Sequence, residues 1–197
     1  MPCAYHRPVP SLTRRAFAKV NLALSVGPPE PPGSPRAGWH PICSWMHAID
    51  LADDLVVERA TVESTHEVAW TADAPRPTPI DWPIESDLAV RAHRLLESEA
   101  GRSLPIRMRL SKRIPVGAGL GGGSSDAATA LLAINTLLDL QLPVASLREL
   151  SACLGSDVAF FLDDPDPPRP AIVSGFGDRI ERLDARRPEW LVLIMPP

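Results

Sequence analysis

Apolar residues recur along the chain with two periods, and the change of period marks where strands give way to helices. Alternation of apolar and charged residues over Pro105–Ile114 predicts a half-buried strand, because successive strand side chains point to opposite faces. Apolar residues at helical spacing over Asp87–Ala100, followed by Gly101, predict a helix with a C-terminal stop. The Ala- and Leu-rich run Ser124–Leu138 predicts a buried helix.

The remaining segments complete a mixed pattern of strands and helices. We expect strands over Phe17–Val26, Trp45–Ile49, Asp54–Arg59, Ala171–Val173, Asp178–Leu183 and Trp190–Met195, with a turn at Ala52-Asp53 and a further helix over Leu147–Leu154. This order predicts an α+β domain with a mainly antiparallel or mixed sheet. Because the last strand has the composition of a central one, we expect residues 1–185 to form one domain and residues 186–197 to begin a second, truncated one.

Composition narrows the classes of function. A net charge of −4 argues against nucleic acid as a partner, because phosphate backbones require a basic face. The three cysteines have no metal-ligand spacing, which favours reduced thiols. Since no apolar run approaches the length of a membrane span, we expect a cytoplasmic protein without a membrane partner.

The clearest chemical feature is a glycine-rich loop between a predicted strand and a predicted helix. Its residues are Pro115, Val116, Gly117, Ala118, Gly119, Leu120, Gly121, Gly122, Gly123, Ser124 and Ser125. Glycine lets backbone amides approach a phosphate without a Cβ clash, and a helix N-terminus favours an anion. We expect Ser124 and Ser125 to cap the helix, and the loop to bind the phosphates of a nucleotide.

Two other nucleotide motifs are excluded by their context. A Walker loop requires a lysine after the glycines, and none follows here. The spacing of Gly117, Gly119 and Gly122 matches the dinucleotide fingerprint, but a Rossmann unit needs a second parallel strand where Gln141-Leu142-Pro143 leads into another helix. A flexible glycine turn without a ligand stays the alternative.

Four ordered motifs resemble those of the GHMP kinase superfamily, and within it the family of 4-diphosphocytidyl-2-C-methyl-D-erythritol kinases. Pro115–Ala128 resembles the second motif of the superfamily, with the triple glycine and Ser-Ser-Asp of that family. Ala18–Leu22 is similar to its AKxNL segment, and Leu154–Phe161 to its LGADVPFF segment. Gly38-Trp39-His40, followed by Ile49–Asp53, is similar to its GYH segment and the strands after it.

The resemblance implies a ribosomal-protein-S5-domain-2-like α+β N-terminal domain with a mixed or antiparallel sheet packed on helices. It implies ATP as phosphoryl donor, with Mg²⁺, and as acceptor the methylerythritol hydroxyl of a cytidine-diphosphate substrate in the non-mevalonate isoprenoid pathway. The chain departs from the family in three ways. A third glycine-rich motif is absent, Trp39 stands where tyrosine is usual, and Ala159 stands where proline is common.

The family motifs and the residues together suggest individual roles. Asp157, a carboxylate beside an apolar run, is our candidate general base, and Lys19, in an apolar strand, is its expected partner. Asn21 shares the strand face of Lys19 and can hydrogen-bond the acceptor. His40 offers ring nitrogens and Trp39 a stacking face to the cytosine. The plainer alternatives are a turn aspartate, a solvated lysine and a turn histidine.

Two further questions stay open at this point. The second partner of the cytosine could be Ile172 or Phe176. The function could also be that of another GHMP kinase, acting on homoserine or mevalonate, although Gly38-Trp39-His40 and the triple glycine argue against it. A nucleotide-binding fragment without turnover is the alternative outside enzymes.

Overall fold

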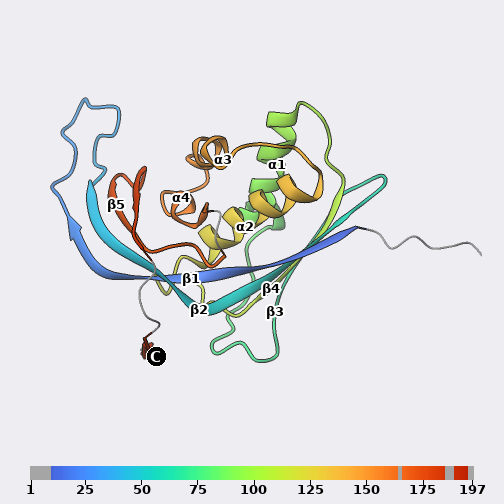
Figure 1. Ribbon diagram of the computed structural model, residues 1–197, viewed down its shortest axis with the longest axis horizontal. Coiled ribbons are helices and arrows are strands. Elements are labelled where there is room, and N and C mark those ends of the chain that lie inside the picture. The colour runs from blue at the N-terminus through green and yellow to red at the C-terminus, as the bar shows by residue number, and fades with distance from the viewer. Residues whose placement is uncertain (1–9, 164–165, 185–188, 195–197) are drawn as a thin grey trace, which may run out of the picture.

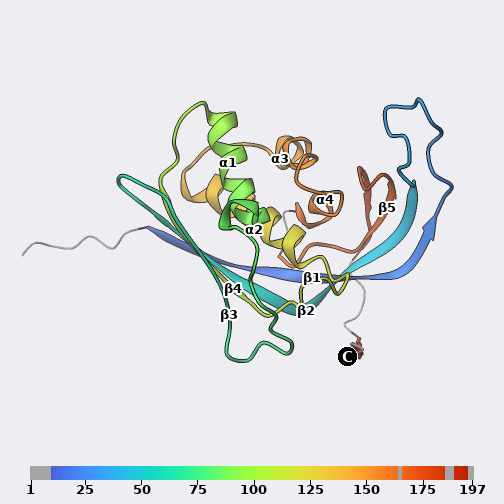
Figure 2. The same cartoon turned by 180° about the vertical axis from the view of Figure 1, so that it is seen from behind.

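The computed structural model of the protein describes residues 10–163, 166–184 and 189–194. A curved sheet forms one layer, and the helices lie together on one of its faces (Figures 1 and 2). The strands are β1 (Ser11–Val26), β2 (Ile42–Arg59), β3 (Thr65–Trp70), β4 (Ile106–Lys112), β5 (Ala171–Gly175) and β6 (Arg179–Arg182). The helices are α1 (Leu88–Ala100), α2 (Gly122–Leu137), α3 (Val144–Ser151) and α4 (Val158–Phe161), with a 3₁₀ turn at Ile84–Ser86.

The long strand β2 organises the sheet. The order is β3-β4-β2-β5-β6, and β1 pairs with β2 along its whole length. On its other side β2 pairs with β4 through residues 54–59 and with β5 through residues 42–46. All pairs are antiparallel except β3 with β4, which are parallel. The prediction of an α+β domain with a mixed sheet is therefore confirmed.

The expected turn at Ala52-Asp53 is wrong, because β2 is a single strand through this point. Ala52 and Asp53 pair with Phe17 and Ala16 of β1, and both are almost fully buried. The carboxylate of Asp53 is satisfied inside the protein, where it accepts hydrogen bonds from Lys112 and from the backbone N–H of Ile114. Strand β3 and helix α4 were not predicted at all.

The strand expected over Trp190–Met195 is also wrong for the residues that the structure describes. Residues 189–194 form no regular element, and the side chains of Trp190, Val192 and Ile194 are largely exposed. An apolar run forms a strand only where a neighbouring strand supplies hydrogen bonds, and none of the described strands pairs with this segment. Met195 and residues 186–188 lie outside the described residues, so the division at residue 185 stays a prediction.

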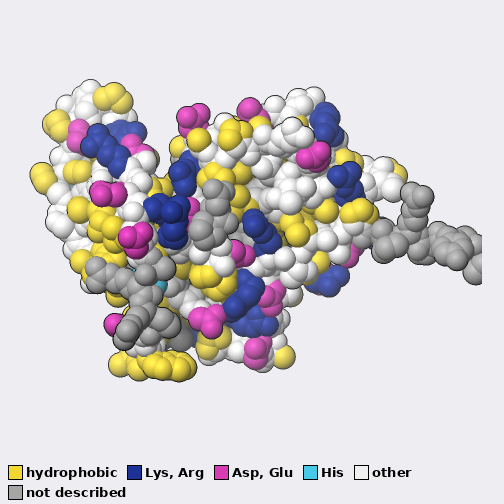
Figure 3. All heavy atoms as spheres, in the orientation of Figure 1, with side chains coloured by type: hydrophobic (Ala, Val, Ile, Leu, Met, Phe, Trp, Pro, Cys, Tyr) yellow, Lys and Arg dark blue, Asp and Glu magenta, His cyan; other side chains and the backbone are white. Residues whose placement is uncertain are grey.

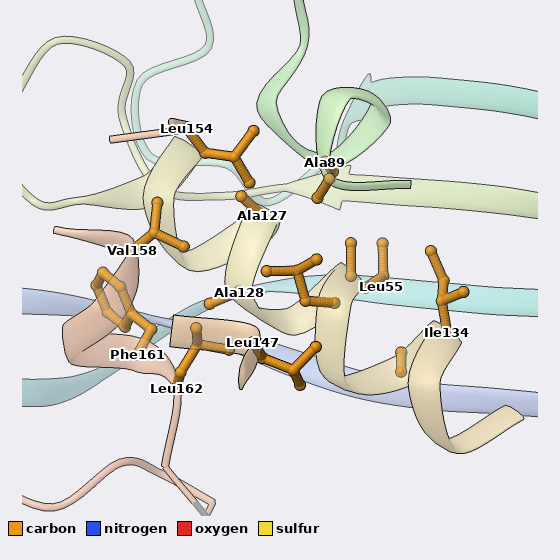
Figure 4. Close-up of a cluster of buried hydrophobic side chains, with 14 of the residues drawn as sticks. Leu55, Ala89, Ala127, Ala128, Ile134, Leu147, Leu154, Val158, Phe161 and Leu162 are labelled. Carbon is orange, nitrogen blue, oxygen red and sulfur yellow. The ribbon is translucent and has the colours of Figure 1, made fainter. Parts of the chain in front are cut away.

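Helix α2 forms the centre of the core. Its small, buried side chains, including Ala127 and Ala128, allow α1, α4 and the sheet to approach it closely. Leu55 from β2, together with Val158 and Phe161 from α4, packs in the same cluster (Figure 4). Since the glycine loop leads directly into α2, this packing fixes the start of the helix relative to α4.

Candidate functional site

The loop between β4 and α2 turns sharply because three of its glycines have positive φ angles. Gly117, Gly119 and Gly121 have φ of 75°, 72° and 72°, the left-handed region that favours glycine. Gly121 is the N-cap of α2, and among the described residues no side chain caps the helix at this end. First-turn amides and the positive end of the helix dipole are thus directed at the loop, an arrangement that binds phosphate.

The expected capping role of Ser124 and Ser125 is wrong. Because Gly121 makes the turn, α2 begins at Gly122, two residues earlier than expected, and both serines lie within its first turns. The backbone N–H of Ser125 donates to the carbonyl of Gly121 at 2.8 Å, and the residue is buried. A Cβ atom added at Gly155 would lie 3.7 Å from Ser124 Oγ, so this hydroxyl faces the segment that carries Asp157.

The glycine loop lines an open cavity of about 220 Å³. Trp82, Asp87 and Leu88, which precede and begin α1, line it as well. The indole Nε1–H of Trp82 donates to Asp87 Oδ2 at 3.3 Å, while Asp87 Oδ1 caps α1 by accepting from the backbone of Ala89. Sequence reasoning missed Trp82 because it lies in a proline-rich loop with no periodic pattern.

A buried charge cluster lies at the base of the same cavity. Lys112 Nζ donates to Asp53 Oδ2 and to Asp126 Oδ2, each at 2.6 Å, and all three side chains are at most 4% exposed. Asp53 Oδ1 also accepts the backbone N–H groups of Arg113 and Ile114, the residues that enter the glycine loop. The cluster thereby ties β2, β4 and α2 together beneath the loop.

The carboxylates of Asp53 and Asp126 share the ammonium group of Lys112, and burial together with this sharing shifts the pKa values of Asp126 and Lys112. Burial raises the pKa of Asp126 well above its usual range; Asp53 adds to the effect and Lys112 opposes it. Burial alone would lower the pKa of Lys112, but the carboxylates of Asp126 and Asp53 outweigh it and raise that pKa. Asp126 Oδ1 has no hydrogen-bond partner among the described residues.

Lys19 and Asp157 lie beside the glycine loop. Lys19 Nζ is 3.3 Å from Asp157 Oδ2, and it also donates to Asn21 Oδ1 at 2.7 Å. The side chain of Lys19 is 7% exposed and that of Asp157 27% exposed, so the carboxylate is accessible while the lysine is enclosed. The backbone N–H of Lys19 donates to Leu120 O in the loop at 2.9 Å, and Asn21 Nδ2 donates to Ser44 Oγ at 2.6 Å.

Gly121 is the point at which the glycine loop meets this pair. A Cβ atom added there would lie 3.0 Å from Lys19 Cγ and 3.0 Å from Phe161 Cζ. Only a residue without a side chain therefore lets the loop, Lys19 and α4 come together at this point. The positive φ of Gly121 is a second reason for glycine at this position.

Trp39 and His40 lie on a separate arm, the loop between β1 and β2 (Figure 1). Trp39 is 57% exposed, and its ring meets Phe176 edge-on with centroids 6.1 Å apart. The guanidinium of Arg36 covers the Phe176 ring at 4.4 Å. His40 Nδ1 lies 2.9 Å from the carbonyl of Gly27, which can only accept, so Nδ1 carries the proton and Nε2 is an acceptor in the neutral ring.

The two candidates for the second partner of the cytosine lie in different surroundings. Phe176 contacts it, whereas Ile172 pairs in the sheet opposite Trp45. The tip of the β5–β6 hairpin also connects the arm with the segment that leads to Asp157. A Cβ atom added at Gly177 would lie only 2.7 Å from the carbonyl oxygen of Ser156, which precedes Asp157.

Basic and acidic side chains are interspersed on the face shown in Figure 3, with no continuous basic surface there. Within residues 10–163, 166–184 and 189–194, no three His, Cys, Asp or Glu side chains are grouped as metal ligands. None of the helices described is both long and apolar enough to cross a membrane.

Residues 87–163, which include the glycine loop and Asp157, match the family described as GHMP kinases N terminal domain. The 4-diphosphocytidyl-2-C-methyl-D-erythritol kinase of Burkholderia mallei (strain SAVP1) is 37% identical over 92% of the chain and 56% of its own length. The corresponding kinase of Geobacter metallireducens is 39% identical over 94% of the chain and 60% of its length.

The fold agrees with these relatives. A crystal structure of 4-(cytidine 5'-diphospho)-2C-methyl-D-erythritol kinase superposes with a TM-score of 0.66 at 38% identity, over 87% of this chain and 55% of that one. The chain therefore spans a little more than half the length of the relatives it matches. Helices, mixed sheet and glycine loop agree with the matched domain, and the chain belongs to the GHMP kinases, of which it carries the N-terminal domain.

Proposed function

We propose that the whole protein transfers the γ-phosphoryl group of ATP to the methylerythritol hydroxyl of 4-diphosphocytidyl-2-C-methyl-D-erythritol. The observation that carries the proposal is the Lys19–Asp157 pair, 3.3 Å apart and hydrogen-bonded through the Lys19 backbone to the glycine loop. Such an arrangement supplies a base for an alcohol and a cation beside a phosphate site. The names of the relatives at 37–39% identity support the choice of acceptor.

On this proposal the glycine loop holds the triphosphate. The amides of the first turn of α2 donate to phosphate oxygens, and the hydroxyl of Ser124 faces Gly155, in the segment that leads to Asp157. Phosphoryl transfer depends mainly on positioning and on charge balance, which these groups provide without forming a covalent bond.

Asp157 accepts the proton of the attacking hydroxyl, and Lys19 is the cation paired with its carboxylate. Only the aspartate is partly exposed, which suits a group that must reach a substrate. Lys19 also stabilises negative charge on the phosphoryl group as it moves. Asn21 Oδ1 also accepts a hydrogen bond from the ammonium of Lys19, which restricts the position of that group beside Asp157.

The arm that carries Trp39 and His40 holds the cytosine. Cytosine carries an exocyclic amine donor, and the Nε2 lone pair of His40 is the matching acceptor. Trp39 provides an exposed ring, and Phe176 supplies the second aromatic surface.

Mg²⁺ accompanies ATP in this proposal and neutralises the charge of its phosphates when bound. Mg²⁺ is usually held by one or two carboxylates together with substrate phosphates. The described residues fit that mode, because Asp126, which lines the cavity of the glycine loop, has a carboxylate oxygen, Oδ1, without a hydrogen-bond partner among the described residues.

The test is phosphoryl transfer by the whole protein from ATP to three acceptors in parallel. We expect turnover with 4-diphosphocytidyl-2-C-methyl-D-erythritol and none with homoserine or mevalonate. A preference for either of the other acceptors would assign a different GHMP activity. Binding of ATP without transfer to any acceptor would identify a nucleotide-binding protein and overturn the proposal.

A further inference from the structure

The segment that carries Asp157 has little structure of its own. Helix α4 has only four residues and begins directly after Asp157, and no side chain among the described residues caps that end. A single helical turn is not stable in isolation, because nucleation fixes several dihedrals for one hydrogen bond. The position of the Asp157 carboxylate must therefore be set by contacts from other elements.

Two arginines hold the opposite end of α4. Arg182, on β6, donates through Nη2 to the carbonyl of Phe160 at 2.6 Å and to that of Leu162 at 3.3 Å. Arg148, on α3, donates to Leu162 O through Nε at 3.0 Å and Nη2 at 2.7 Å. Cations at this end satisfy the free carbonyls of the last turn and complement the helix dipole.

Arg182 is itself held in place on several sides. Its guanidinium lies over the Phe160 ring at 5.3 Å, donates through Nη1 to Arg169 O at 2.9 Å, and approaches the buried carboxylate of Asp163 at 3.5 Å. Its side chain is only 11% exposed. Burial lowers the pKa of Arg182 to about 10, with Asp163 opposing the effect, so the side chain is still charged at neutral pH.

The same hairpin contacts the segment on the other side of Asp157. Gly177, with φ of 92°, packs so closely against the carbonyl of Ser156 that a Cβ atom there would lie 2.7 Å from it. Between Gly177 and Arg182 the hairpin therefore touches the chain both before and after Asp157. It also carries Phe176, the partner of Trp39.

We propose that Arg182 is a positioning residue: by holding the carbonyl end of α4, it keeps the carboxylate of Asp157 within reach of Lys19 and the glycine loop. This inference rests on the proposed function for the role of Asp157. It makes the β5–β6 hairpin the physical connection between the aromatic pair of the arm and the proton-accepting group.

The variant Arg182→Lys keeps the charge but removes the forked donation to Phe160 O and Leu162 O. A misplacement of about 1 Å can reduce turnover by about a hundredfold, so we expect a fall in kcat of about tenfold to a hundredfold. KM for ATP should change by less than about twofold, because the glycine loop is untouched. Arg179→Lys, an exposed arginine of the same strand, is the matched control and should behave like the unaltered protein.

Two further measurements separate positioning from general destabilisation. Adding Arg182→Lys to an Asp157→Asn background should cause almost no additional loss of kcat, because the arginine acts through that carboxylate. Hydrogen exchange of the amides of residues 158–162 should accelerate in Arg182→Lys, with α1 unchanged. Unchanged kcat, equal losses in both backgrounds, or unchanged exchange in residues 158–162 would each overturn the proposal.

The exchange measurement does not depend on the reaction. If the unaltered protein showed no turnover, the proposed function would fail, while accelerated exchange confined to residues 158–162 would still support the contact made by Arg182. If Arg182→Lys did not fold, Arg148→Lys would replace it, since it weakens the same Leu162 carbonyl contact. Normal kcat and normal exchange in that variant would then count against the proposal that arginine contacts with the carbonyl end of α4 position Asp157.

Discussion

The ammonium of Lys19, in the middle of β1, lies 3.3 Å from the carboxylate of Asp157, the residue directly before α4. The pair is not an ordinary surface ion pair, because the lysine is enclosed and the aspartate is only partly exposed. Gly121 packs so closely against Lys19 and Phe161 that a Cβ atom added there would lie 3.0 Å from each side chain. The glycine loop, β1 and α4 therefore meet at this point.

The glycine loop should lose affinity for ATP when its backbone is strained. Gly119→Ala places a side chain at φ of 72°, with no atom within 4 Å to clash, so the effect is purely conformational. Strain of about 1–2 kcal/mol should displace the phosphate-binding amides. Loss of one hydrogen bond to a charged group then lowers the affinity by about tenfold or more, as calorimetry with ATP would measure.

Gly101→Ala is the matched control for that experiment. Gly101 has φ of 60°, also without neighbours within 4 Å, but it ends α1 away from the loop. Both variants should lose similar stability, and only Gly119→Ala should lose ATP affinity. Equal ATP affinity in the two variants would show that the loop does not bind the nucleotide. Gly122 is a poorer target, because an added Cβ would lie 2.9 Å from Ile114 Cγ2.

His40 should recognise the base and not the phosphoryl donor. His40→Ala removes the Nε2 acceptor, and the loss of one hydrogen bond should raise KM for the cytidine substrate by about tenfold. KM for ATP should stay within about twofold, because the arm that carries His40 is separate from the glycine loop. Steady-state kinetics with each substrate varied in turn make the comparison. Similar increases for both substrates would contradict the separate role of the arm.

Asp126 should make the protein less stable as the pH rises. Its pKa is raised above the usual 3.8 by burial, so between 3.8 and the raised value the folded state binds a proton that the unfolded state has released. The free energy of unfolding therefore falls with rising pH across that interval. Asp126→Asn removes this proton exchange while leaving Lys112 paired with Asp53.

The measurement for Asp126 is urea unfolding of both proteins from pH 4 upward. The stability of Asp126→Asn relative to the unaltered protein should increase as the pH rises. Asp50→Asn is the control, because Asp50 is 85% exposed and pairs only with the exposed Arg15 among the contacts described. Parallel stability curves for Asp126→Asn and the unaltered protein would show that the buried carboxyl does not titrate in this way.

Short sequence patterns were sufficient to predict the elements around the glycine loop. The alternation before Ile114 and the glycines after it predict a strand, a loop and a helix, all of which the structure contains. The motifs around Lys19 and Asp157 indicated two candidates that the fold brings together, although their roles stay predictions. Each of these inferences required only neighbouring residues or a family motif.

The features that the sequence did not reveal depend on contacts between distant segments. Asp53 resembled a turn residue because its partner Lys112, which also pairs with Asp126 of α2, lies on the distant strand β4. Trp190 resembled a strand residue, although no described strand pairs with it. The contacts of Arg182 with α4 likewise join the second strand of a hairpin to a helix too short to predict. No local pattern encodes such pairings.

The pairing of Lys19 with Asp157 is the central claim, and the kinetics of three variants test it. Asp157→Asn removes the base and keeps the shape, so kcat should fall by about a hundredfold to ten-thousandfold with KM values near normal. Lys19→Met should also lower kcat. Because the two residues act as one unit, the double variant should lose less than the product of the single losses.

The most direct measurement is therefore kcat of the Asp157→Asn, Lys19→Met and double variants of the whole protein, with ATP and 4-diphosphocytidyl-2-C-methyl-D-erythritol. The account predicts a large loss in Asp157→Asn and little further loss when Lys19→Met is added to it. Near-normal turnover in Asp157→Asn would contradict the role of the base, and strictly multiplicative losses would contradict the pairing.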